Sequence, residues 1–204
     1  MTETSGLIRR AVDFGERIFL VMLSVPFLCA FLRVLPTRPY VVLTAISEML
    51  GVVLILSRKP GEVATRPFPI VIAFAGTALP LLVRPGGIQL VPSLVASILM
   101  SVGLAISVAS KVSLNRSFGL VAANRGVKRG GPYRVIRHPM YVGYFVAEVG
   151  FVLTNFSTRV MLIYAAAWCA QLLRVLEEER ILRTDPAYAA YSTSVPSRLI
   201  PGLF

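Results

Sequence analysis

Residues 125–144 read RGVKRGGPYRVIRHPMYVGY and gather charge, glycine, proline, the single histidine and three tyrosines into one short stretch of an otherwise apolar chain. Gly130, Gly131 and Pro132 predict a turn. Glycine tolerates positive φ, and proline disfavours helix at the residue before it. This density of polar and conformationally special residues indicates a functional loop.

A second break follows at His138 and Pro139, after which the residues from Met140 to Thr154 are apolar almost throughout. Proline is tolerated in the first turn of a helix, so we expect a helix to begin at Pro139. The backbone N–H groups at a helix start are unpaired and lie at the positive end of the dipole, where they can bind an anionic or polar ligand. A helix cap for the histidine and interfacial anchors for the tyrosines are the alternative roles.

The composition is that of an integral membrane protein. Of 204 residues, 55% are hydrophobic and 15% are charged, and the mean hydropathy is +0.72. The segment from Met1 to Arg17 is polar, and no short apolar region with a cleavage site follows it, so we expect no cleaved signal peptide. Cys29 and Cys169 lie inside apolar segments, which predicts buried small hydrophobes rather than a disulfide or a metal pair.

Six apolar segments are candidate membrane helices, and the chain is predicted to be all-α. They are 18–35, 40–57, 67–83, 90–110, 139–154 and 160–173. The last two are only a few residues apart and should form a tight helical hairpin about Asn155, Phe156 and Ser157. We expect two regions: four spans in 1–110 and a catalytic region in 111–204.

Basic residues are distributed unevenly over the segments between these spans. Seventeen fall in the N-terminus, the second and fourth connections and the C-terminus, against four in the other connections: Arg33, Arg38, Arg84 and Arg159. By the positive-inside rule, both termini are predicted to be cytoplasmic. The net charge of +11 then reflects orientation and contact with anionic lipid rather than nucleic acid.

Three elements should converge at the cytoplasmic face: the glycine-rich loop, the helix start at His138 and the end of the sixth span at Arg174. Arg174 and Glu178 are four residues apart and project from one helix face, where a surface salt bridge is the simplest reading. Tyr188 and Tyr191 are expected to pack, in a short tail that folds back against this face.

These motifs carry a family resemblance. G-P-Y-R-x-x-R-H-P-x-Y-x-G at 131–143, R-x-x-x-E at 174–178, Y-x-x-Y at 188–191 and a closing Pro201 resemble the isoprenylcysteine carboxyl methyltransferase family and its prokaryotic relatives. The resemblance covers about the C-terminal 90 residues. It implies a membrane enzyme that binds S-adenosylmethionine in a cytoplasmic pocket and methylates a lipophilic small-molecule or lipid-linked acceptor in the membrane. The short loops suggest a bacterial protein of the inner membrane, surrounded by membrane lipids.

The resemblance also implies the site residues. It assigns Arg174 to the acceptor, as the catalytic residue, and ten residues to the cofactor: Arg125, Gly126, Val127, Lys128, Tyr133, His138, Pro139, Met140, Tyr141 and Glu178. Their chemistry suits these roles. A carboxylate can accept from the ribose diol or the ammonium of S-adenosylmethionine, and aromatic rings can face its adenine or sulfonium.

The acceptor and two acids are left open. A carboxylate acceptor needs no general base, since the nucleophile is already ionised, and O-methylation is the first expectation. The alternatives are a phospholipid N-methyltransferase, a thiol S-methyltransferase, a membrane reductase, or a non-enzymatic protein such as a transporter subunit. Acids inside spans are costly and indicate function by default, so Glu148 could line a substrate cavity and Glu48 could pair with a polar neighbour.

Overall fold

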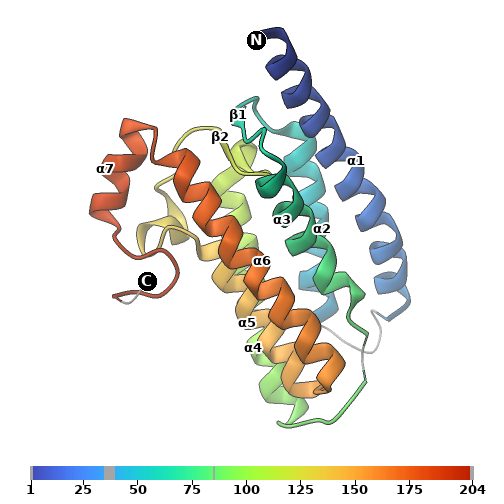
Figure 1. The fold of residues 1–204 in the computed structure, drawn as a ribbon. Coiled ribbons are helices and arrows are strands. Elements are labelled where there is room, and N and C mark those ends of the chain that lie inside the picture. The colour runs from blue at the N-terminus through green and yellow to red at the C-terminus, as the bar shows by residue number, and fades with distance from the viewer. Residues whose placement is uncertain (1, 35–39, 85, 203–204) are drawn as a thin grey trace.

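The structure, a computed structural model, describes residues 2–34, 40–84 and 86–202. It is mostly helical, with 73% of the residues in helices. The α-helices of this part of the chain are α1 Thr2–Val34, α2 Tyr40–Ser57, α3 Pro67–Ala78, α4 Ser93–Leu114, α5 Pro139–Thr154, α6 Thr158–Leu182 and α7 Pro186–Ser194 (Figure 1). Between them lie the short 3-10 helices η2 Leu79–Leu82, η3 Asn115–Ser117 and η4 Gly131–Arg134, and the strands β1 Glu62–Val63 and β2 Ala123–Asn124.

Each predicted span coincides with a helix, with differences at the ends. Leu35, the last residue of the first predicted span, lies outside the described residues. α4 continues four residues beyond its predicted end, so Lys111 belongs to the helix and not to the loop after it. α6 runs without interruption from the sixth span into the glutamate-rich segment, and Asp185 then caps α7.

Two of the helical segments in the described ranges are long and apolar enough to cross a membrane, Ser93–Ser117 and Thr158–Leu182. Shorter apolar helices cover 45–57, 67–82 and 139–154. The predicted count of six spans therefore stays a prediction.

Small residues let α4 and α5 pack closely, and this is the most extensive helix contact of the fold. A Cβ on Gly143 would lie 2.6 Å from the carbonyl oxygen of Gly103, and one on Gly150 would lie 2.9 Å from the carbonyl oxygen of Ala96. Close approach through small side chains is how helices associate in lipid, where apolar surface gives no driving force. The contact fixes α5, and with it His138, against the end of α4.

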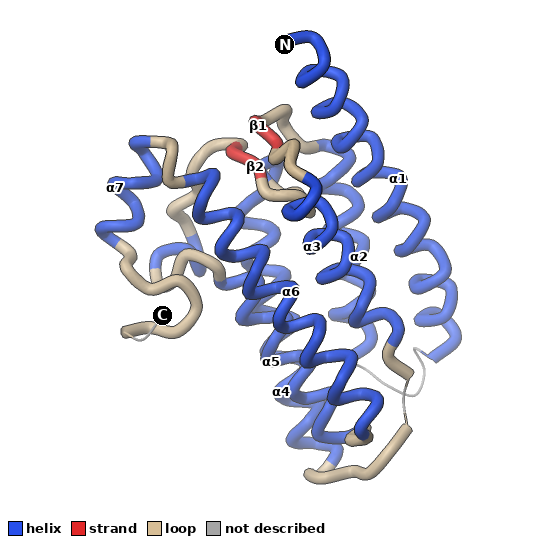
Figure 2. Tube along the Cα trace, viewed as in Figure 1, coloured by secondary structure: helices blue, strands red, loops and turns tan. Residues whose placement is uncertain are grey.

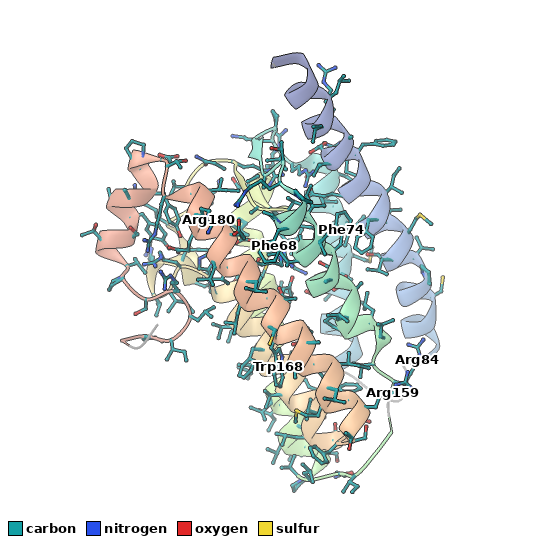
Figure 3. All side chains as sticks on the ribbon, in the orientation of Figure 1. Phe68, Phe74, Arg84, Arg159, Trp168 and Arg180 are labelled. Atoms are coloured by element: carbon teal, nitrogen blue, oxygen red, sulfur yellow. The ribbon has the colours of Figure 1, made fainter. Side chains whose placement is uncertain are left out.

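The connections contact one another in two groups. β1 pairs with β2, and the Lys59 N–H donates to the Arg116 carbonyl oxygen at 2.8 Å, near the N-terminal end of α1 (Figure 2). At the opposite end, the Ile88 N–H donates to the Phe156 carbonyl oxygen at 2.8 Å, and Figure 3 places Arg84 and Arg159 there. The expected hairpin is present, with Ser157 as the N-cap of α6. The second and fourth connections thus meet at one end of the helices, and the third and fifth meet at the other. This is the alternation that the distribution of basic residues predicts.

The cysteine prediction is wrong in one respect. Cys29 and Cys169 are free, but both are exposed rather than buried. The outer faces of these helices carry many other exposed apolar side chains, among them Met22, Ile98 and Leu162. A helix surrounded by lipid has no reason to bury all its apolar residues, so an apolar sequence position does not imply an interior one.

Candidate active site

The glycine-rich loop forms the predicted turn. Gly126 has φ +94° and Gly131 has φ +58°, both in the left-handed region that favours glycine. Pro132 follows in the first turn of η4, which buries Tyr133. The Tyr133 carbonyl oxygen accepts a 2.6 Å hydrogen bond from the Tyr191 hydroxyl of α7. The loop is therefore held from both sides by its own turns and by α7.

His138 is the N-cap residue of α5, as predicted, and its side chain is buried between two carboxylates of α6. Nε2 lies 3.0 Å from Glu179 Oε1, and Nδ1 lies 3.6 Å from Glu178 Oε2. Burial lowers the pKa of His138, but hydrogen bonds with Glu178 and Glu179 outweigh it and raise the pKa above 6.5. The imidazolium form is therefore favoured in this site.

The C-terminal tail folds back on the helix start, as expected, and occupies backbone groups there. The N–H groups of Arg137 and His138 donate to the carbonyl oxygens of Ser197 and Arg198 at 3.0 and 2.9 Å. The expectation that the backbone at this helix start stays open to a ligand is therefore wrong for these two residues. The backbone N–H groups of Arg137 and His138 are therefore not available to a ligand.

Glu179 organises the network, and sequence reasoning missed it. Its carboxylate accepts from Arg137 Nε at 2.7 Å, from the Tyr188 hydroxyl at 2.6 Å and from Arg183 Nε at 3.1 Å, besides its contact with His138. Three consecutive glutamates gave no sign of which one faces inward. Glu179 joins the loop, α6 and α7, whereas the neighbouring Glu178 keeps part of its carboxylate accessible.

A first cavity opens beside these residues. Glu178 lines it and accepts a short hydrogen bond from the Tyr141 hydroxyl. Nine of the ten predicted cofactor residues line this cavity; Pro139 does not. The lining residues are Leu114, Ser117, Gly119, Val121, Ala123, Arg125, Gly126, Val127, Lys128, Tyr133, Arg137, His138, Met140, Tyr141, Glu178, Leu182, Tyr188 and Tyr191. Tyr188 and Tyr191 pack as expected and also form part of the wall.

Arg125 supplies an unsatisfied cation to this cavity. The residue is 9% exposed, and its Nε and Nη2 atoms are buried and find no hydrogen-bond partner among the described residues. Its guanidinium lies directly against Gly119, where a Cβ would collide with it. Burial, followed by the charge of Arg58, lowers the pKa of Arg125 to about 10. An anionic ligand in the cavity would satisfy the free donors.

A buried ionic cluster supports the loop from α1. Arg58 forms ion pairs with Asp13 and Glu16, and Glu16 also accepts from the backbone N–H of Val121, which lines the first cavity. Sequence reasoning counted Arg58 only as a loop charge. The cluster shows that the N-terminal helix takes part in shaping the site.

A second cavity lies among the helices. Met140 lines both cavities, so the two adjoin. The other lining residues come from six α-helices and the segments next to them: Leu20, Glu48, Gly51, Gly76, Thr77, Pro80, Leu81, Lys111, Phe118, Leu120, Tyr144, Glu148, Gln171 and Arg174. Its wall carries two cations and two acids in otherwise apolar surroundings.

Arg174 lies in the second cavity and not in the first. It donates to the Leu120 carbonyl oxygen at 2.9 Å and to Gln171 Oε1 at 3.2 Å. Its guanidinium carbon lies 5.3 Å from the ring centre of Tyr141. Among the described residues no ion pair joins Arg174 to Glu178, so the simple reading of a salt bridge between them is wrong.

The sequence did not predict two features of the second cavity: the burial of Lys111 and the hydrogen bond between Trp168 and Glu148. Lys111 follows the predicted end of a span, yet it is 2% exposed and lines this cavity. Glu148 lines it as expected, and it accepts a 2.7 Å hydrogen bond from Trp168 Nε1 of α6. The polar partners come from helices distant in sequence, so no local motif could reveal them.

The protein is thus helical and has two adjoining cavities. The first is lined by many polar residues, and the second is mostly apolar with four charged side chains in its wall. Residues 91–188, which hold both motifs, match the family model for phospholipid methyltransferase. That family belongs to the same superfamily of membrane methyltransferases as the isoprenylcysteine carboxyl methyltransferases. The match indicates a methyltransferase domain and, with the two long apolar helices, a membrane protein. A comparison with curated proteins found no match.

Proposed function

We propose that this protein is an S-adenosylmethionine-dependent methyltransferase that binds its cofactor in the first cavity and a lipophilic acceptor in the second. One observation carries the proposal. Nine predicted cofactor residues line one cavity, the predicted acceptor residue Arg174 lines the other, and Met140 lines both. The phospholipid methyltransferase match over residues 91–188 supports the same reaction class.

The residues of the first cavity fit the cofactor. Arg125 has buried, unpaired donors that suit the carboxylate of S-adenosylmethionine. Glu178 has acceptor capacity left for the ammonium or the ribose diol, and Tyr133 and Tyr141 offer aromatic surface to the adenine or the sulfonium. The guanidinium of Arg125 is the strongest argument for an anionic ligand, because buried polar groups are normally hydrogen-bonded.

When bound, the cofactor supplies an electrophilic methyl group, which leaves sulfur as the bond to the acceptor atom forms. The protein's part is to hold the two molecules in line and to exclude water. Alignment of this kind can be worth up to about 7–11 kcal/mol. Met140 and Tyr141, at the junction of the cavities, set the distance between cofactor and acceptor, and Arg174 beside Tyr141 orients the acceptor.

A carboxylate is the first candidate for the acceptor atom. An ionised carboxylate attacks without losing a proton, and Arg174 can hold one of its oxygens while the other reacts. The second candidate is the amine of a phospholipid, which the family match favours. An amine must lose a proton, and Glu148 is a carboxylate within the second cavity that could accept it.

Two experiments test the proposal. Calorimetry with S-adenosylhomocysteine should show saturable binding, and a transporter subunit or other non-enzymatic protein would show none. Labelled S-adenosylmethionine incubated with membrane extract should then yield a labelled lipid. Alkali releases methanol from a methyl ester and not from an N-methyl group, so it separates the two acceptors.

We also propose that both termini and the connections at 58–66 and 111–137 face the cytoplasm. The contacts between the two connections support their lying on the same side of the membrane, and the excess of basic residues on that side favours the cytoplasm. Cys29 and Cys169 are free and exposed, so they must first be replaced. An impermeant thiol reagent added to intact cells should then label cysteine at Gly86 or Phe156 and not at Ala122. The reverse pattern would refute the orientation.

A further inference from the structure

Lys111 is a buried cation inside the second cavity. It lies in the last turn of α4, and its Nζ donates to the carbonyl oxygen and the hydroxyl of Ser47, both at 2.8 Å. An ammonium has three donors, so one is left over. A lysine that served only to tie α4 to α2 would not need to bring a charge into the apolar interior.

Neither cation of this cavity takes part in a salt bridge within the described part of the chain. The Nε of Arg174 is buried and finds no hydrogen-bond partner there. Buried charges are costly unless they are paired. Of the two acids in the wall, Glu148 is engaged by Trp168. Lys111 and Arg174 are therefore the groups in this wall whose N–H donors are left for a ligand.

The two cations flank one aromatic pair. Lys111 Nζ lies 5.3 Å from the ring centre of Tyr144, and the Arg174 guanidinium lies at the same distance from the ring centre of Tyr141. The two rings meet edge to face with centres 6.4 Å apart. Lys111 and Arg174 therefore each contact one ring of the same tyrosine pair, next to the junction of the two cavities.

We propose that Lys111 acts with Arg174 to bind an anionic group of the acceptor, a carboxylate or a phosphate, and that Lys111 thereby determines acceptor specificity. The proposal rests on the role of the second cavity as the acceptor site. It predicts that lipids with a negative head group enter this cavity and that neutral lipids of the same chain length do not. A bound anion would supply the missing partner for both cations.

The single tryptophan of the chain, Trp168, gives a direct readout of binding, because it is hydrogen-bonded to Glu148 in the cavity wall. Bromine quenches tryptophan fluorescence at short range. In detergent, dibromostearic acid and a brominated lysophosphatidic acid should quench Trp168 saturably, and the neutral dibromostearyl alcohol should bind about tenfold more weakly or worse. The two acids separate a carboxylate site from a phosphate site.

Variants isolate the contribution of Lys111. Lys111→Met should weaken anion binding by about tenfold or more, and Lys111→Arg should stay within a few-fold of the wild type. Lys59→Met removes the same charge from an exposed loop position and should change nothing. Equal binding of the acid and the alcohol to the wild type would overturn the proposal without any variant, as would undiminished binding by Lys111→Met.

Calorimetry with S-adenosylhomocysteine on the same samples separates this proposal from the proposed function. Retained cofactor binding in Lys111→Met shows that the fold and the first cavity are intact. Absence of cofactor binding in the wild type would refute the methyltransferase proposal, whereas the quenching data would still decide whether the second cavity selects anions.

Discussion

The two cavities differ in how the chain builds them. The first is lined mainly by two contiguous segments, the loop and helix start at 114–141 and the α6–α7 segment at 178–191, and these carry the recognisable motifs. The second is lined by single residues from α1, α2, α3, α4, α5 and α6 and the loops between them. The proposed cofactor site is therefore built from recognisable sequence motifs, and the proposed acceptor site from residues scattered along the chain.

The two cavities also differ in how many of their polar groups are paired. In the first, His138 and Glu179 belong to a network in which most polar groups are paired, and Arg125 stands out as unpaired. In the second, Lys111 and Arg174 have no acidic partner among the described residues. Substitutions in the two cavities should therefore produce separable defects.

Arg174→Ala should have the largest effect and should fall on catalysis alone. We expect methyl transfer to drop by about 100-fold or more, because the acceptor is no longer held in line. S-adenosylhomocysteine affinity should stay within a few-fold, since Arg174 does not line the first cavity. Arg174→Lys should recover little, because an ammonium lacks the planar fork. Initial rates and calorimetry on the same preparation measure both. Loss of S-adenosylhomocysteine affinity in Arg174→Ala would contradict the assignment of Arg174 to the acceptor.

Glu178→Ala should show the opposite defect. Loss of a hydrogen bond to a charged group weakens binding by about 1.5–3 kcal/mol, and calorimetry with S-adenosylhomocysteine would measure it. Glu177→Ala is the matched control, since Glu177 is the preceding residue of the same helix, pairs with Arg66 and Arg180 and lines neither cavity. Equal affinity of the two variants for S-adenosylhomocysteine would contradict the assignment of Glu178.

The His138 network should make stability depend on pH. The pKa of His138 is raised above 6.5 in the folded protein, so its protonated form stabilises the fold fully below about pH 6.5. That contribution is lost as the pH rises through the folded-state pKa. The melting temperature in detergent should thus fall over this range in the wild type and fall less in His138→Asn. Identical pH profiles would show that the imidazolium does not support the network.

Ser157→Ala should have the smallest effect and should spare both cavities. Ser157 caps α6 at the end of the molecule far from the sites, and its Oγ accepts from the Val160 N–H at 3.3 Å. Loss of an N-cap costs about 1 kcal/mol. Thermal unfolding should record a small decrease in melting temperature, with cofactor affinity and methyl transfer rate per folded protein unchanged. A selective loss of activity would mean that the hairpin takes part in the site.

Particular residues show how much of the fold and of the candidate site the sequence predicts. The helices and the turn at Gly131 followed from apolar runs and from backbone chemistry. The proposed cofactor residues followed from family motifs in the loop, at the start of α5 and in α6. Lys111 was assigned to a loop because apolar patterning sets helix ends poorly, and the end of α4 lies four residues beyond its predicted place. Glu179 and the Glu148–Trp168 pair depend on contacts between α5, α6 and α7 that no local pattern encodes. Cys29 and Cys169 were misjudged because apolar residues face outward in this fold.

The central claim, that cofactor and acceptor occupy different cavities, is tested most directly by cysteine protection. Val127→Cys places a thiol in the first cavity and Thr77→Cys places one in the second, each in a background without Cys29 and Cys169. Saturating S-adenosylhomocysteine should slow the reaction of a maleimide with the cysteine at 127 and leave the rate at 77 unchanged. Protection of the thiol at 77, with none at 127, would contradict the account.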